Sequence, residues 1–347
     1  SRPGTPFGVR VPHDRERDPV VARQRRRYGG SVLAVGAIGS IALVAGSPLA
    51  DAMVVGAVVT TACVLADLVL MGLAHRAIST AKQSQRWYAD TRQAVVTDTT
   101  LRTDPVPVPR WGLIGALAVI ALTVVLGGLR YGELPRPLVY PGGESVPTTP
   151  WTAFGPVIVQ LVLAAVILLV VLGVRRSRPD LDAARPIASA RRYRLYLRAV
   201  YTTLFTTAIG GSLSLMLVAL NLWAVIPDTP LWTIVAIVPM VVVAAGWLVL
   251  VFTVGDAGHR LPAVDGDEPA DAAPQRTQHD DDRYWHLAGN VYFNRDDPAF
   301  LVHRRVGAGW TTNMAHPGSW VILAVVIALI ALAAFGIIPN VHYRLTL

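Results

Sequence analysis

Seven long apolar runs dominate this sequence, and few folds can accommodate so many of them. They cover roughly residues 31–49, 52–73, 111–129, 153–174, 199–225, 231–254 and 319–338. A helix of about 20 apolar residues crosses a hydrocarbon layer of about 30 Å, and each run has about that length. Only 16% of the 347 residues are charged, whereas ordinary globular domains have about 25%. We therefore predict an all-α integral membrane protein with seven transmembrane helices.

The distribution of arginine and lysine predicts the direction of the chain. Segments 1–30, 74–110, 175–198 and 255–318 contain 8, 6, 8 and 6 of these residues, whereas the alternate connections hold only Arg130, Arg136 and Arg344. Positive residues are retained on the cytoplasmic side, so the N-terminus should lie inside and the C-terminus outside. The net charge of +8 is clustered beside the apolar runs, which does not indicate a nucleic-acid partner.

The same pattern divides the chain into eight parts. In chain order we expect a basic cytoplasmic tail (1–30), a transmembrane hairpin (31–73), a cytoplasmic helix with a Pro-rich connector (74–110), a four-helix membrane domain (111–254) with an outer loop (130–152), an acidic linker (255–282), a cytoplasmic interfacial module (283–318), the last transmembrane helix (319–338) and an external tail (339–347).

The module before the last helix is rich in aromatics, glycines and charges. Two short apolar runs, 291–293 and 300–302, flank Asn294–Pro298, whose composition is typical of a turn. We therefore predict a small β-hairpin there, with a second turn at Gly307 and Gly309. One interpretation is that the module docks the seventh helix at the membrane surface, with Trp310 and Trp320 at headgroup level. The alternative is a ligand site, in which His303, Arg304, Arg305 and His316 face a lipid headgroup or phosphate.

A few polar residues lie within the apolar runs. Asp67 is either close enough to the interface to reach water or Arg76, or a proton or cation site inside the bundle. Gln160 is expected to form a buried hydrogen bond between helices. The small and hydroxylated residues of the fifth run, including Gly210 and Gly211, favour close helix packing, with a substrate path as the alternative.

No catalytic or cofactor motif is present in the sequence. We found no triad order, metalloprotease motif, phosphate-binding loop or paired carboxylates on one face, so the chain is predicted to be non-enzymatic and to need no cofactor. The spacing of His279, Asp280–Asp282 and His286 matches no closed set of metal ligands. Cys63 is the only cysteine, which excludes an intrachain disulfide.

The outer loop and fourth run resemble a known bacterial domain. Leu134, Pro135, Gly142, Trp151, Phe154, Pro156 and Gln160 carry the resemblance. It is to a membrane domain of unknown function, shared with the immunity and signalling protein of the sporulation-delaying toxin system. Where that family has a Pro-x-His-Phe-like element and an Asp, this chain has Leu138-Val139-Tyr140 and Glu144. The resemblance implies a bacterial plasma-membrane protein that meets an extracellular peptide.

The interfacial module resembles a second, uncharacterised module that often accompanies the first. The resemblance is carried by Tyr284, Trp285, Tyr292, Asn294, Asp296, Asp297, Pro298, Gly309, Trp310, Asn313, His316, Pro317 and Trp320. This module has no known biochemical activity, so the resemblance indicates a family relationship but implies no reaction.

These observations favour a membrane protein that senses, or gives immunity to, an envelope-active agent. Its partners would be membrane lipids and an extracellular peptide or hydrophobic ligand. The alternatives are a transporter of a lipid or small hydrophobic compound, coupled to protons through Asp67, and a membrane enzyme acting on a prenyl or phospholipid substrate. The candidate ligand-binding residues are Asp67, Glu133, Tyr140, Glu144, Trp151, Gln160, Arg304, Arg305, Trp310, Asn313 and His316.

Overall fold

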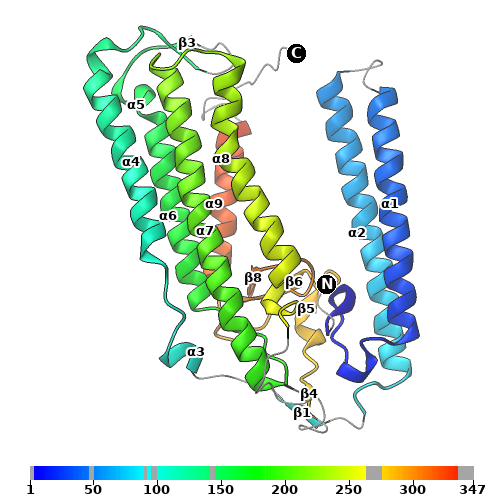
Figure 1. The fold of residues 1–347 in the computed structure, drawn as a ribbon. Coiled ribbons are helices and arrows are strands. Elements are labelled where there is room, and N and C mark those ends of the chain that lie inside the picture. Colours follow the sequence, from blue (N-terminus) through cyan, green and yellow to red (C-terminus); the bar gives the residue numbers. More distant parts are fainter. Residues whose placement is uncertain are drawn as a thin grey trace. The chain divides into compact units, whose positions relative to one another are not determined.

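The computed structural model of the chain consists mainly of long helices (Figure 1). It describes residues 4–46, 51–89, 92–94, 100–140, 145–183, 185–262 and 276–334. Within them, six helices are long and apolar enough to cross a membrane. The chain forms two compact units. The hairpin unit comprises Ser1–Asp98, Arg178–Ser189 and Ala263–Pro317, and the bundle unit comprises Thr99–Ser177, Ala190–Pro262 and Gly318–Leu347.

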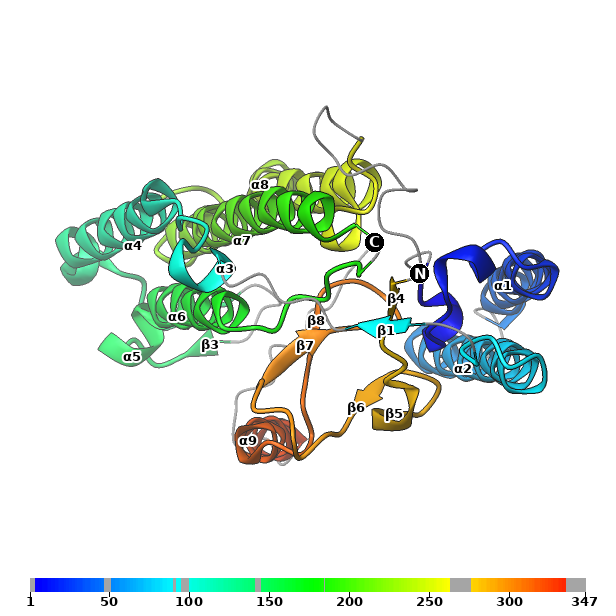
Figure 2. The same cartoon turned by 90° about the horizontal axis from the view of Figure 1, so that it is seen from below.

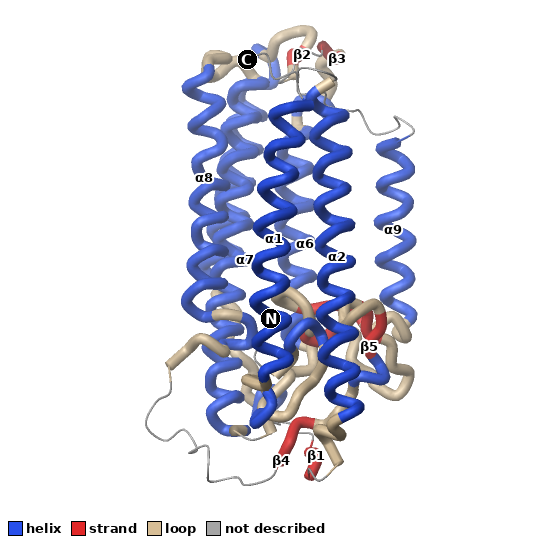
Figure 3. The backbone as a smooth tube through the Cα atoms, turned by 90° about the vertical axis from the view of Figure 1, so that its right-hand side faces the viewer, coloured by secondary structure: helices blue, strands red, loops and turns tan. Residues whose placement is uncertain are grey.

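Two long antiparallel helices form the main body of the hairpin unit. These are α1 (Pro19–Gly46) and α2 (Ala52–Ser84), which pack along each other (Figure 3). Helix α1 begins twelve residues before the expected span, at a proline that suits the first helical turn. The Asp18 carboxylate accepts a hydrogen bond from the Val20 amide at 2.9 Å and so satisfies a free donor of that turn.

The N-terminal segment is folded onto the end of α2. It contains the short helical turns η1 (Pro6–Gly8) and η2 (His13–Arg15). Its apolar side chains are buried in a core that it shares with α1, α2 and Trp87, and the buried members are Phe7, Val9, Val11, Val21, Met71, Ala74, Ile78 and Trp87. Part of the segment that we expected to be a basic tail therefore belongs to a packed core, because Phe7, Val9 and Val11 recur at every second position and are buried together.

Among its described residues, the hairpin unit also contains three pairs of short strands. Strand β1 (Arg92–Ala94) is parallel to β4 (Arg276–Gln278). After the helical turn η6 (Asp282–Tyr284), β5 (Trp285–His286) pairs antiparallel with β6 (Val291–Tyr292), and β7 (Leu301–His303) pairs antiparallel with β8 (Trp310–Thr312).

The predicted pairing of 291–293 with 300–302 is wrong. Each of these runs pairs with a different partner, and Asn294–Pro298 connects two hairpins. The first hairpin turns where Leu287, Ala288 and Gly289 all have positive φ. The second turn contains Gly307 and Gly309 at φ +82° and +89°, as the sequence predicts. Glycine adopts this left-handed conformation without steric cost, so it determines where the second hairpin reverses.

Helix α7 is the central element of the bundle unit. It extends over Pro186–Leu222, and from Ala190 onward it belongs to this unit. Figure 2, viewed along the helices, shows it beside α4 (Arg110–Arg130), α6 (Gly155–Arg175) and α8 (Pro230–Val249). The shorter elements are α3 (Thr100–Thr103), η3 (Tyr131–Glu133), β2 (Leu138–Val139), β3 (Ser145–Val146), α5 (Pro150–Ala153), the π-helical turn η4 (Leu250–Val254) and η5 (Asp256–Gly258).

Glycines allow the helices to approach α7 closely. A Cβ atom on Gly210 would lie 2.6 Å from a Val243 methyl on α8, and one on Gly211 would lie 2.5 Å from a Leu163 methyl on α6. Gly210 and Gly211 of the fifth apolar run therefore serve helix packing. The indole of Trp247 on α8 adds a hydrogen bond to the Thr207 hydroxyl at 3.1 Å.

The last helix, α9 (Pro317–Ala334), begins directly after the second hairpin. Its first residue is a proline, which the sequence predicts as a helix start. It is uniformly apolar over Pro317–Ala328 but shorter there than the six long helices. The end of the expected seventh span and the external tail lie outside the described residues, so the seventh crossing stays a prediction.

Candidate functional site

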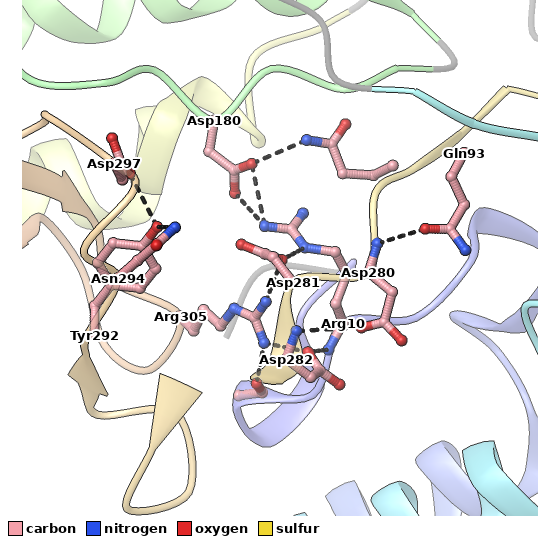
Figure 4. Close-up of polar contacts among 12 residues, drawn as sticks. Arg10, Gln93, Asp180, Asp280, Asp281, Asp282, Tyr292, Asn294, Asp297 and Arg305 are labelled. Carbon is pink, nitrogen blue, oxygen red and sulfur yellow. Dashed lines mark hydrogen bonds and ion pairs between the residues drawn. The ribbon is translucent and has the colours of Figure 1, made fainter. Parts of the chain in front are cut away.

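Charged side chains from five separate segments meet in the hairpin unit, and we call this group the ionic centre. Its members are Arg10, Lys82, Asp180, Asp280, Asp281, Asp282 and Arg305. Figure 4 shows the guanidinium groups of Arg10 and Arg305 converging on Asp281. Arg10 donates from Nε to Asp281 at 2.8 Å and from Nη2 to both carboxylate oxygens of Asp180 at 3.2 Å.

Arg305 is the most deeply buried member, with a side chain that is only 1% exposed. It forms ion pairs with Asp281 and Asp282, and it donates to the Gly8 carbonyl at 3.0 Å. The Trp285 ring covers its guanidinium at 4.9 Å. The side chain is therefore engaged within the protein, whereas the neighbouring Arg304 is exposed.

Lys82 connects the end of α2 to the acidic run. Its Nζ lies 2.7 Å from an oxygen of Asp280 and 2.6 Å from an oxygen of Asp282. The ammonium also lies 4.7 Å from the centre of the Tyr88 ring. Three of the aspartates expected in a flexible linker are thus held by basic side chains of the N-terminal segment, α2 and the second hairpin.

Burial and charge act in opposite directions on these carboxylates. Burial alone would raise the pKa of Asp281, but Arg10 and Arg305 attract its charged form more strongly and lower the pKa below its usual value. In the same way, Arg305 and Lys82 overcome the effect of burial and lower the pKa of Asp282. The lowered pKa values favour the charged forms of Asp281 and Asp282, which are the forms that hold the basic side chains of the ionic centre.

A second network organises the connection between the two hairpins. The Asn313 amide donates to the carbonyls of Asn294 at 2.8 Å and Asp297 at 3.0 Å, and its oxygen accepts from the amides of Asn294 and Ala315 at 3.1 Å. The Tyr292 hydroxyl donates to Asp297 at 2.9 Å, and burial raises the pKa of Tyr292 to about 12. Arg178 approaches the same carboxylate at 2.8 Å.

The candidate residues of the module thus have different surroundings. Asn313 is fully buried and holds the loop, and Arg305 belongs to the ionic centre. The His316 ring packs against Phe300 at 5.2 Å, and the Trp310 ring packs against His303 at 4.9 Å. No described group of three or more His, Cys, Asp or Glu side chains is placed to hold a metal ion.

The described parts of the predicted outer loop, residues 130–140 and 145–152, form a cap on one end of the bundle unit. Leu134, Leu138 and Trp223 are buried together beneath it. The Trp223 indole donates to the Ala153 carbonyl at 2.9 Å, and the Tyr140 hydroxyl donates to the Thr152 carbonyl at 2.7 Å. The candidate Tyr140 therefore fixes the loop to α5.

Other side chains of this cap face outward. Trp151 is 78% exposed and Val139 is 54% exposed. Glu133 is also exposed and lies 3.3 Å from Arg130. The candidate Glu144 lies outside the described residues. Of the candidates in this loop, Glu133 and Trp151 are accessible to a ligand.

A buried polar contact joins three helices of the bundle unit. Gln160 on α6 is 0% exposed, and its amide donates to the Thr123 hydroxyl on α4 at 3.1 Å and to the Ser212 carbonyl on α7 at 2.7 Å. Gln160 is therefore a hydrogen-bonding residue between helices, as the sequence predicts. In the hairpin unit, Asp67 is partly buried, and one of its carboxylate oxygens has no hydrogen-bond partner among the described residues.

Comparison with known proteins identifies one short segment. The sequence profile of a family of unknown function, DUF5808, matches residues 295–320. This segment contains the second hairpin, Asn313 and the start of α9. It overlaps only part of the module whose resemblance the sequence suggests, since Tyr284, Trp285, Tyr292 and Asn294 lie outside the match. No curated protein and no solved structure matches the chain.

The ionic centre is the main feature that sequence analysis did not find. Its partners are separated by 272 positions for Arg10 and Asp282 and by 198 for Lys82 and Asp280. The one available signal was the only lysine of the sequence, next to a polar helix end, together with the run Asp280–Asp282. Neither pattern identifies its partner without a fold.

Proposed function

We propose that the protein is a non-enzymatic, multi-pass bacterial plasma-membrane protein that senses, or gives immunity to, an envelope-active agent through its outer loop. In this proposal the chain crosses the membrane seven times with its N-terminus inside. The observation that carries it is the cap that the described part of this loop forms. Its buried side chains hold the backbone in place, and Val139 and Trp151 face outward. Ordered, exposed apolar side chains suit an amphipathic ligand, since little entropy is lost when they bind.

The resemblance of the loop to the domain of the toxin immunity protein also supports a sensing or immunity function. Because this resemblance is one of sequence pattern, it suggests the kind of agent and leaves the site to be tested. In this proposal the module lies on the cytoplasmic side and relays the signal. The ionic centre supports a relay because it joins five segments, so that a change in one of them can reach the others.

The proposal is tested in bacteria that express the full chain. Cells would be challenged with cationic pore-forming peptides and with amphipathic peptide toxins, and the inhibitory concentrations would be compared with those of cells lacking the chain. We expect protection against at least one peptide, and its loss in the double variant Val139→Ser/Trp151→Ala. Trp111→Ala is the matched control, because Trp111 is 53% exposed at the other end of α4. If no peptide discriminates, or if the control loses protection equally, the proposal fails.

A transporter is the second candidate, and the carboxylate oxygen of Asp67 without a partner favours it. An intramembrane acid that is not neutralised by a neighbour is a candidate proton site. Uptake of a hydrophobic compound into proteoliposomes would be measured under a proton gradient, with Asp67→Asn beside the native chain. Equal flux in both would exclude a coupling role for Asp67.

A further inference from the structure

A half-open cavity of about 480 Å³ lies at the end of α6 in the bundle unit. Its wall consists of Leu101 and Pro105 from the segment before α4, Leu172 and Arg175 from α6, and Arg176, which follows the last residue of α6. The connector is held over the end of α6 in two ways. Val106 is buried, and Arg194 of α7 donates to the Asp104 carbonyl at 2.9 Å.

The two arginines give the cavity an uncompensated positive charge. Both side chains are exposed, and among the residues that the structure describes no carboxylate lies within ion-pair distance of either. Arginines at a helix C-terminus can simply offset the helix dipole. That dipole supplies only about half a negative charge, however, so two guanidinium groups leave a positive excess.

An apolar stripe leads away from the cavity along α6. Val162, Val166, Leu169 and Leu172 follow one another at helical spacing, and all four are more than 40% exposed in the bundle unit. Leu172 belongs to both the stripe and the cavity wall. A ligand that fits both parts has an anionic headgroup and a long hydrocarbon chain.

We propose that this cavity binds the phosphate headgroup of an anionic phospholipid, with an acyl chain lying along Val162–Leu172. Arg175 and Arg176 contact the phosphate, since guanidinium groups form charge-assisted hydrogen bonds with its oxygens. The proposal rests on membrane insertion of the bundle unit and is independent of any role of the outer loop.

The test uses the purified full chain in neutral detergent and native mass spectrometry. Phosphatidylglycerol and phosphatidylcholine with identical acyl chains would be titrated, and the apparent Kd of the first bound lipid compared. We expect the chain to prefer phosphatidylglycerol. Arg175→Gln/Arg176→Gln should weaken phosphatidylglycerol binding by about tenfold or more, as expected for loss of charge-assisted hydrogen bonds.

Arg110→Gln/Arg198→Gln is the matched control. It removes the same charge from exposed arginines of α4 and α7 that are not part of the cavity wall, so binding should be unchanged. Arg175→Lys/Arg176→Lys should retain most of the preference, which also shows that changes at these positions permit folding. Equal losses in the Gln variant and the control, or equal binding of both lipids, would overturn the proposal. Displacement of the lipid by inorganic phosphate would overturn it in favour of a free-anion site.

Discussion

At the scale of single residues, the surroundings of a side chain decide its role more than its type does. Arg304 and Arg305 are adjacent and were equivalent candidates for an anionic ligand. In the structure Arg304 is exposed, whereas Arg305 is buried against Asp281 and Asp282. Both residues follow His303, the last residue of β7, and of the two only Arg305 forms ion pairs with the acidic run.

Replacement of Arg305 should therefore destabilise the hairpin unit. Arg305→Gln removes one of two basic partners from each of two partly buried carboxylates, since Asp281 keeps Arg10 and Asp282 keeps Lys82, and should cost about 1–3 kcal/mol. Arg304→Gln changes an exposed neighbour and should cost at most about 0.5 kcal/mol. Thermal unfolding in detergent, followed by circular dichroism, measures both. Similar melting temperatures for the two variants would show that the ionic centre contributes little to stability.

The lowered pKa values of Asp281 and Asp282 predict an acid-sensitive stability. A carboxyl group whose pKa is lower in the folded state stabilises the fold fully above its unfolded pKa, about 3.9 for Asp. That contribution is lost as the pH falls through the still lower folded value. The melting temperature should therefore drop below about pH 4.

The variant Asp281→Asn isolates this effect. It should be less stable at neutral pH and should lose less stability on acidification, because one of the linked protons is absent. Asp296→Asn, at an exposed position, should follow the native pH profile. Parallel profiles for the native chain and Asp281→Asn would contradict the assignment.

At the scale of elements, turns and close contacts decide which segments meet. A Cβ atom on Gly8 would lie 2.5 Å from the Ala288 carbonyl oxygen, in the turn between β5 and β6. Gly8 also has φ +80°. The N-terminal segment can therefore approach the first hairpin only through a residue without a side chain.

Two glycine variants separate steric contact from backbone conformation. Gly307 has φ +82° with no atom near its missing Cβ, so Gly307→Ala should cost about 1–2 kcal/mol for the left-handed conformation alone. Gly8→Ala adds a clash with the Ala288 carbonyl oxygen, so it should cost about 1–3 kcal/mol more than Gly307→Ala. The rate of proteolytic cleavage between residues 4 and 18 would show whether the N-terminal segment has detached from the first hairpin. Equal stability of the two variants would show that the segment yields without cost.

The elements themselves could be predicted in part from the sequence. The apolar runs identified the long helices, because roughly 20 apolar residues in succession leave few alternatives. The pairing of the strands could not be predicted, because strands of two or three residues carry little pattern and their partners depend on turn geometry. The conformation at Leu287 and Ala288, both with positive φ, has no sequence signal of the kind that Gly307 provides.

At the scale of the whole molecule, the distribution of charged residues predicts the direction of the chain across the membrane, but it does not predict which charged side chains pair with each other. The asymmetry of arginine and lysine was visible in the sequence, and so was the short module before the last helix. The ionic centre was not, because it depends on the folding of segments that are nearly 300 residues apart. Long-range ion pairs leave no periodicity in a sequence.

The predicted membrane direction can be tested with single cysteines. In a Cys63→Ser background, Ser145→Cys in the outer loop should react with a membrane-impermeant maleimide on intact cells. Ser84→Cys, at the end of α2, should react only after permeabilisation. Labelling at Thr346→Cys on intact cells would support the seventh crossing. The reverse pattern at positions 145 and 84 would invert the chain in the membrane.

The burial of Lys82 has a consequence for the chemical reactivity of the chain. Lys82 carries the only ε-amine of the sequence, and two aspartates hold that amine in the ionic centre. Acylating reagents such as succinimidyl esters should therefore spare this position while the hairpin unit stays folded. Brief acylation of the native chain, followed by peptide mapping, would measure the fraction of chains modified at position 82. Because the folded ionic centre protects the amine, that fraction reports how often the ionic centre opens.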